Sequence, residues 1–129
     1  MTQDWAILLL GLLVAHFLGD FTPLATARMQ EAKANAGPMS QVAAHAAVHG
    51  LLVGLVVALL SVSSWGLIAA AAGIEFATHF LIDAARARAG LYVATLRDPA
   101  RPAFWRVLGA DQLAHQLVLV FLAVLVLRA

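Results

Sequence analysis

Four long apolar stretches constrain the fold of this chain more than any other feature of its sequence. They cover about residues 5–23, 42–62, 65–83 and 107–127. Each is close to the roughly 20 mostly apolar residues that a membrane-spanning helix needs. Of the 129 residues, 63% are hydrophobic and 12% are charged, whereas soluble domains have about 25% charged residues. We therefore expect an all-α membrane protein, a four-transmembrane-helix bundle that forms a single domain over residues 1–129.

The distribution of basic residues predicts the orientation of this bundle. The linkers 24–41 and 84–106 hold seven of the eight Lys and Arg residues, and four spans place both linkers on the same side. The positive-inside rule then predicts cytoplasmic linkers and two termini outside the cytoplasm. Residues 1–4 lack the basic segment of a secretory signal, so we expect the first span to be retained.

A repeated polar pattern suggests that the bundle consists of two quasi-repeated helical hairpins. The first and third spans both end in His-Phe-Leu-x-Asp, 63 residues apart, and the second and fourth spans both begin with two ionisable residues at the same spacing. The four pairs are His16 and Asp20, His45 and His49, His79 and Asp83, and Asp111 and His115. Since the two hairpins have the same orientation, the pattern predicts a parallel repeat.

These eight residues and Glu75 are ionisable side chains inside predicted spans. Within each span a spacing of four residues puts them on one helical face. Measured from the cytoplasmic ends, they fall in two layers roughly 6 and 12 Å deep, with Asp83 nearer the surface. Because a charge facing lipid costs at least about 2.5–3.5 kcal/mol, we expect these side chains to face the bundle interior.

The nine residues form a candidate metal site. Imidazole and carboxylate ligands suit zinc, iron or manganese, and the absence of cysteine excludes thiolate ligands. Because a zinc ion takes three or four protein ligands, nine candidates indicate one or two divalent transition-metal ions, with zinc preferred. The eight paired residues are the predicted ligands, with Asp83 in a supporting position. Glu75 is the predicted general base, or else a bridging ligand.

Two further features bear on packing and on the linkers. Gly50 and Gly54, four residues apart in the second span, offer a small-residue face for close helix packing. The arginines of linker 84–106 are interpreted as topology determinants. A second role for them is attraction of an anionic lipid or phosphate substrate to the mouth of the site.

The ordered polar motifs resemble a small bacterial and phage membrane family catalogued as domain of unknown function 3307. The motifs are His16-Phe-Leu-Gly-Asp-Phe21, His45-x3-His49, His79-x2-Ile-Asp83 and Asp111-Gln-x2-His115. The resemblance covers essentially the whole chain, and it implies a multi-pass protein of the bacterial inner membrane. The chain departs from the family pattern at Thr22-Pro23-Leu24, where members continue with a hydrophobic-Gln segment, and this affects only the exit from the first span. The family name carries no activity.

These observations favour a membrane-embedded metal-dependent hydrolase that acts on a lipid or lipid-linked substrate at the cytoplasmic side, where the metal would acidify a water molecule. The alternatives are a divalent-metal or proton transporter or relay, a di-iron-type oxidase, a bis-histidine haem protein and a non-catalytic membrane module. A transporter fits less well because the polar groups fill only the cytoplasmic half of the spans. The expected partners are the lipid bilayer, a lipid-derived substrate and further copies of the chain. The net charge of +1 argues against a nucleic-acid partner, since proteins that bind nucleic acid usually carry a strong basic surplus.

Overall fold

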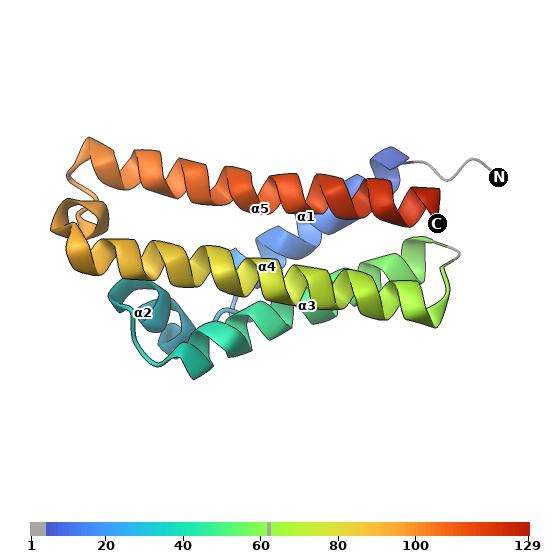
Figure 1. The fold of residues 1–129 in the computed structure, drawn as a ribbon, viewed down its shortest axis with the longest axis horizontal. Helices are drawn as coiled ribbons and strands as arrows, with labels where there is room; N and C mark the ends of the chain where they lie inside the picture. The colour runs from blue at the N-terminus through green and yellow to red at the C-terminus, as the bar shows by residue number, and fades with distance from the viewer. Residues whose placement is uncertain (1–4, 62) are drawn as a thin grey trace.

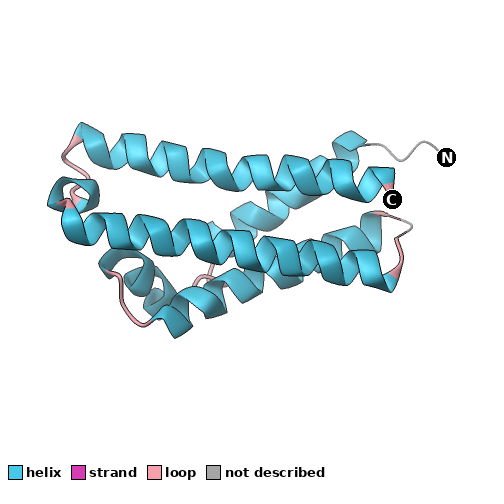
Figure 2. Ribbon diagram, in the orientation of Figure 1, coloured by secondary structure: helices cyan, strands magenta, loops and turns pink. Residues whose placement is uncertain are grey.

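The computed structural model describes residues 5–61 and 63–129, which form five α-helices and one short 3-10 helix (Figures 1 and 2). The helices are α1 (Trp5–Phe21), α2 (Ala27–Asn35), α3 (Met39–Leu60), α4 (Trp65–Tyr92), η1 (Ala94–Arg97) and α5 (Pro102–Arg128). The described residues contain no β-strand, so the predicted all-α class is confirmed. Residues 1–4 and Val62, the last residue of the second predicted span, lie outside the described residues.

The four long helices pack in a closed ring. Helices α1 and α4 each contact both α3 and α5. The start of α1, the turn between α3 and α4 and the end of α5 lie at one end of the bundle, which we call the terminal end, whereas α2 and η1 lie at the opposite end (Figure 1). Three helices, α3, α4 and α5, are long and apolar enough to cross a membrane, and α1 is a shorter apolar helix of 17 residues.

The helix boundaries differ from the predicted span boundaries for local reasons. Helix α1 ends at Phe21 because Pro23 disfavours the helical conformation in the residue before it. Helix α4 continues beyond Asp83 to Tyr92, since residues 84–89 are alternating alanine and arginine with high helix propensity. Helix α5 begins at Pro102, which fits the first turn because a proline lacks the N–H that has no partner there. Much of the predicted linker 84–106 is therefore helical.

The predicted linker 24–41 contains a helix that the sequence analysis did not anticipate. The Thr26 hydroxyl accepts a hydrogen bond from the Met29 backbone N–H and caps the start of α2. The helix ends at Asn35, and the next residue, Ala36, caps it with a left-handed φ of 48° before Gly37 and Pro38. Helix α2 packs on α3 and α4, so it covers the bundle at the end opposite the terminal end.

Apolar side chains fill the interior of the bundle towards the terminal end. This core consists of Leu8, Leu12, Val53, Val57, Ala71, Leu119, Leu122, Ala123 and Val126. Beside it, a Cβ atom at Gly50 would lie 2.8 Å from the Ala72 carbonyl oxygen, and one at Gly54 would lie 3.3 Å from the Ala72 Cβ. The two glycines thus bring α3 close to α4, as the small-residue pattern predicted.

Candidate metal centre

All nine ionisable residues of the predicted spans meet inside the bundle. They lie on all four long helices, and each is between 0 and 7% exposed. Among the described residues they are the only buried polar or charged ones. They are His16, Asp20, His45, His49, Glu75, His79, Asp83, Asp111 and His115. The expectation that these side chains face the interior is confirmed.

His79 lies at the centre of the five imidazole rings. Its ring centroid is 3.7 Å from that of His49 and 4.1 Å from that of His115. The centroids of His45 and His16 are 5.2 and 5.6 Å from it. A single side chain of α4 therefore touches rings from α1, α3 and α5.

Three overlapping groups of these residues could hold a metal ion, because one ligand atom from each member lies within 4.8 Å of the others. The groups are His16, His49, Glu75 and His79; Asp20, His45, His49 and His79; and His79, Asp83 and His115. All three contain His79, so they describe one continuous set of ligands. Asp111, also a predicted ligand, belongs to none of the three and instead lies 3.4 Å from the Arg86 guanidinium.

Glu75 holds His79 from within the same helix. Its Oε1 lies 3.2 Å from His79 Nδ1, and a proton on Nδ1 would leave Nε2 as the ligand atom. A carboxylate behind a histidine commonly orients metal-binding rings in this way. Glu75 Oε2 and His79 Nε2 make no hydrogen bond within the described chain.

The absence of a hydrogen bond within the described chain extends to other polar atoms of the cluster. Nine buried ring-nitrogen and carboxylate-oxygen atoms make no hydrogen bond to any described residue. They belong to His16, His45, His49, Glu75, His79, Asp83, Asp111 and His115. Buried polar groups normally have hydrogen-bond partners. A cluster with this many polar atoms that lack one fits a centre that accepts a cation.

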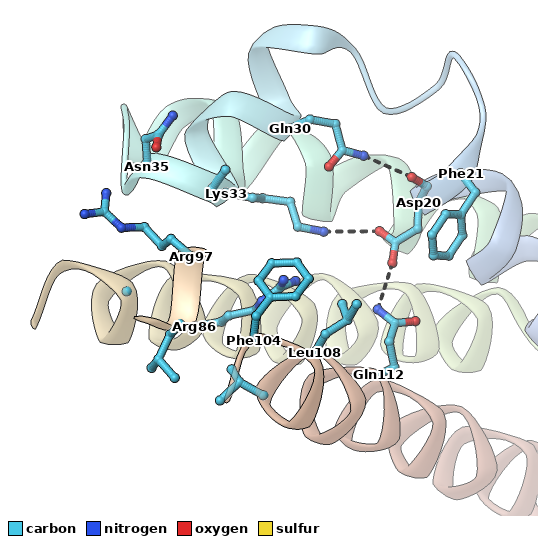
Figure 3. Close-up of a pocket in the computed structure, with 14 residues that line it drawn as sticks. Asp20, Phe21, Gln30, Lys33, Asn35, Arg86, Arg97, Phe104, Leu108 and Gln112 are labelled. Atoms are coloured by element: carbon cyan, nitrogen blue, oxygen red, sulfur yellow. Dashed lines mark hydrogen bonds and ion pairs between the residues drawn. The ribbon is translucent and has the colours of Figure 1, made fainter. Parts of the chain in front are cut away.

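Lys33 of α2 is a member of the site that the sequence analysis missed. Its Nζ lies 3.2 Å from Asp20 Oδ1, 3.2 Å from Asp83 Oδ2 and 3.0 Å from His45 Nε2 (Figure 3 draws the contact with Asp20). From the sequence, this lysine counted only among the basic linker residues that predict the orientation of the bundle. The Thr26 cap followed by helix-forming residues was the signal for α2, and it would have placed Gln30 and Lys33 on one face. Gln30 Nε2 donates to the Asp20 carbonyl oxygen at 2.9 Å.

Asp83, which was expected to lie nearer the surface than the other carboxylates, is fully buried within the bundle. The Asp83 side chain is 0% exposed and lies 3.5 Å from the ring nitrogens of both His79 and His115. Two features bury it: α4 continues beyond it, and α2 packs over it through Lys33. The predicted depth assumed that the helix ended at the membrane surface.

Gln112 links two carboxylates at the edge of the cluster. Its Nε2 donates to Asp20 Oδ2 at 3.3 Å and to Asp111 Oδ2 at 3.4 Å. Its Oε1 accepts from His16 Nε2 at 3.4 Å. The amide therefore connects α5 to α1 without adding a charge.

The charges within the cluster do not balance. Four carboxyl groups lie there, and the cations that contact them are Lys33 and Arg86. With all four carboxyl groups ionised and the histidines neutral, two negative charges stay uncompensated. Since an unpaired buried charge is strongly unfavourable, one divalent cation would restore neutrality.

Gly19 makes room for His49, and an alanine there should disturb the cluster. A Cβ atom at Gly19 would overlap the His49 ring. We expect Gly19→Ala to lower the free energy of unfolding by about 1–3 kcal/mol, as overpacking does. The matched control is Gly73→Ala, because a Cβ there has nothing within 4 Å and should be neutral or stabilising by up to about 1 kcal/mol. Denaturation of the detergent-solubilised protein measures both, and equal effects would contradict the crowding at Gly19.

The model of a family described as "Protein of unknown function (DUF3307)" matches residues 8–129. The matched segment contains all nine buried ionisable residues and Lys33. The resemblance drawn from the four motifs is thus confirmed. No curated protein and no solved structure matches the chain.

Proposed function

We propose that this chain, which belongs to the DUF3307 family of proteins of unknown function, binds one or two divalent transition-metal ions in its buried polar cluster. The observation that carries the proposal is that three groups of potential ligands converge on His79. Zinc is the expected metal, with iron or manganese as alternatives, because all three accept mixed imidazole and carboxylate ligands. The buried polar atoms without a hydrogen bond within the described chain and the excess of two carboxylates support the same conclusion.

We infer that the bundle lies in a membrane as two quasi-repeated hairpins with four spans. Large apolar side chains are exposed on the outside of every long helix, for example Leu10, Leu51, Leu81 and Leu117. The 17 residues of α1 extend roughly 25 Å at about 1.5 Å per residue. This is near the lower limit for a span, and local thinning of the bilayer can accommodate it. The basic linkers support the bacterial inner membrane, with the α2 end in the cytoplasm and both termini outside.

We further infer that the bound metal supports hydrolysis of a lipid or lipid-linked substrate. A metal ion of this class acidifies a bound water and polarises the bond to be cleaved. Glu75 has one carboxylate oxygen free of hydrogen bonds within the described chain, and we assign to it the acceptance of the proton of that water. Its bond to His79 would keep this oxygen beside the metal.

Transport is less well supported because the rest of the bundle interior is apolar. Towards the terminal end the buried residues of the described chain are leucine, valine, alanine and glycine. An ion or proton crossing the full thickness of the bundle would need polar partners there.

Metal content and lipid hydrolysis together test this function. We expect protein purified without chelator or affinity metal to contain one or two equivalents by elemental analysis. Glu75→Gln should keep at least half of that content, because the histidines remain. It should lose at least about a hundredfold in hydrolysis, the lower end of a general base's contribution. The assay follows phosphatidic acid and phosphatidylglycerol in mixed micelles by mass spectrometry.

Each half of the proposal has its own contrary result. Less than half an equivalent of any transition metal in the wild-type protein would refute metal binding. Metal-loaded protein that leaves both lipids intact would refute their hydrolysis but not the metal site. Undiminished hydrolysis by Glu75→Gln would remove Glu75 from its role.

A further inference from the structure

A cavity opens beside the buried cluster, under α2. Its volume is about 420 Å³, which is within the usual range for sites that bind small molecules. Residues from α1, α2, α4, η1 and α5 line it. In Figure 3, Asn35 and Arg97 lie at one end of the cavity, and Gln112 and Phe21 lie at the other.

The lining of the cavity carries a net positive charge. Its charged members are Lys33, Arg86, Arg97 and one carboxylate, Asp20. The amide groups of Gln30, Asn35 and Gln112 add neutral hydrogen-bond donors. Because Lys33 and Arg86 also contact the cluster carboxylates Asp83 and Asp111, Arg97 is the lining charge that favours an anion in this cavity.

Arg97 is the cation of this set that is left free. Within the described chain its guanidinium group makes no ion pair or hydrogen bond, whereas Lys33 contacts Asp20 and Asp83. The aliphatic part of Arg97 lies across Gly90, where an added Cβ would be 2.9 Å from Arg97 Cγ. Gly90 thus lets the side chain lie flat on α4 and keeps it at the rim.

Arg86 has unused hydrogen-bond capacity on the same wall. Its contact is a single one, from Nη1 to Asp111 Oδ2 at 3.4 Å, and its side chain is 26% exposed. A guanidinium has five N–H donors in a planar fork, which matches two oxygens of a phosphate. Arg86 and Arg97 thus each offer free N–H donors to a phosphate group in this cavity.

The cavity also reaches the metal centre. Asp20 and Gln112 line it, and both also belong to the contacts of the buried cluster, through His45 and His16. Phe104, Leu108 and Phe21 provide apolar wall. The rest of a ligand with a phosphate at the rim could thus extend towards Asp20 and Gln112, at the edge of the buried cluster.

We propose that this cavity is the substrate pocket and binds a phosphate group through Arg97 and Arg86, with the rest of the ligand directed towards the buried cluster. The role of the cavity as a substrate pocket rests on the proposed function, whereas binding of phosphate by the arginines does not require the metal. The phosphate can belong to a lipid headgroup or to a free phosphate compound, because both present the same oxygens.

The test uses the full chain in detergent, both chelator-treated and metal-loaded. Isothermal calorimetry with inorganic phosphate and with micellar phosphatidic acid, against phosphatidylcholine as the reference, gives the dissociation constants. We expect Arg97→Gln to weaken the binding of whichever phosphate probe binds by at least about tenfold in the chelator-treated protein, as for loss of a charge-assisted hydrogen bond. The matched control is Arg101→Gln, since Arg101 is 64% exposed, pairs with Asp98 and lies outside the cavity. Its effect should stay within about twofold.

Each outcome decides a stated point. Tighter binding of phosphatidic acid than of inorganic phosphate would identify the ligand as a lipid headgroup. Equal binding of the two would identify it as a free phosphate compound. Either result supports the phosphate pocket. Absence of binding by both probes, or equal weakening by Arg97→Gln and Arg101→Gln, overturns it. Arg97-dependent binding in a protein that never acquires metal would sustain this pocket while refuting the metal centre. A protein that binds metal but shows no Arg97-dependent phosphate binding would support the metal centre and refute the pocket.

Discussion

Replacing His79 with asparagine should weaken metal binding by more than about a hundredfold. His79 is a member of every group of potential ligands, and its ring touches the other four histidines. Changes to residues that merely support ligands cost about 10- to 100-fold, so loss of a shared ligand should exceed that range. At a metal concentration 1,000 times the wild-type dissociation constant, bound metal adds about 4.1 kcal/mol to stability. A hundredfold weaker site would retain only about 1.4 kcal/mol of it.

The measurement is thermal or denaturant unfolding with and without added metal, together with elemental analysis. Asparagine is polar and can still hydrogen-bond to Glu75, so the metal-free variant should stay folded. His45→Asn is the graded comparison, because His45 belongs to one group only, and its metal response should lie between those of the wild type and of His79→Asn. If added metal stabilised His79→Asn as much as the wild type, the metal would bind elsewhere or not at all.

Lys33→Met should destabilise the metal-free protein by about 3–5 kcal/mol. The ammonium group lies 3.2 Å from oxygens of both Asp20 and Asp83, and the Lys33 side chain is 11% exposed. Removing one partner of a buried ion pair leaves the other charge without compensation, which is the source of a loss of this size. Methionine keeps most of the apolar length of lysine, so the loss reports the charge rather than the packing. Unfolding of the chelator-treated protein in detergent measures it.

Two further variants separate this effect from a general loss of basic charge. Arg28→Met removes one positive charge from the exposed side of the same helix and should change stability by no more than about 0.5 kcal/mol. Lys33→Met combined with Asp83→Asn should recover part of the loss, because one uncompensated carboxylate is removed with its partner. If Lys33→Met were as stable as Arg28→Met, the buried ion pairs would contribute nothing.

The long helices and the burial of the polar residues follow from the sequence because both depend on local pattern. Apolar runs of about 20 residues predict helices through composition alone. The spacing of four residues between His16 and Asp20, or between His45 and His49, places each pair on one face. The cost of exposing these groups to lipid then directs the faces inward. No contact between distant segments enters these inferences.

A linear pattern does not reveal a role that depends on a neighbouring segment. Lys33 was counted only among the basic residues of the linkers, because the packing of α2 on α3 and α4 is not visible in the sequence. The burial of Asp83 under α2 is invisible for the same reason. The contact of Asp111 with Arg86 is a further one that spacing along the chain does not reveal.

The apolar runs and the spacing of the ionisable residues are enough to predict an all-helical chain with a buried polar cluster, whose candidate metal ligands, in the absence of cysteine, are histidine and carboxylate. The packing of the helices brings the candidate ligands together around His79, puts a lysine from a linker helix in contact with two of the carboxylates, and leaves a basic cavity beside them. Helical periodicity fixes which face a residue occupies within its own helix. Packing between helices decides which faces meet, and it is through these contacts that charges and ligand atoms lie close enough to act together.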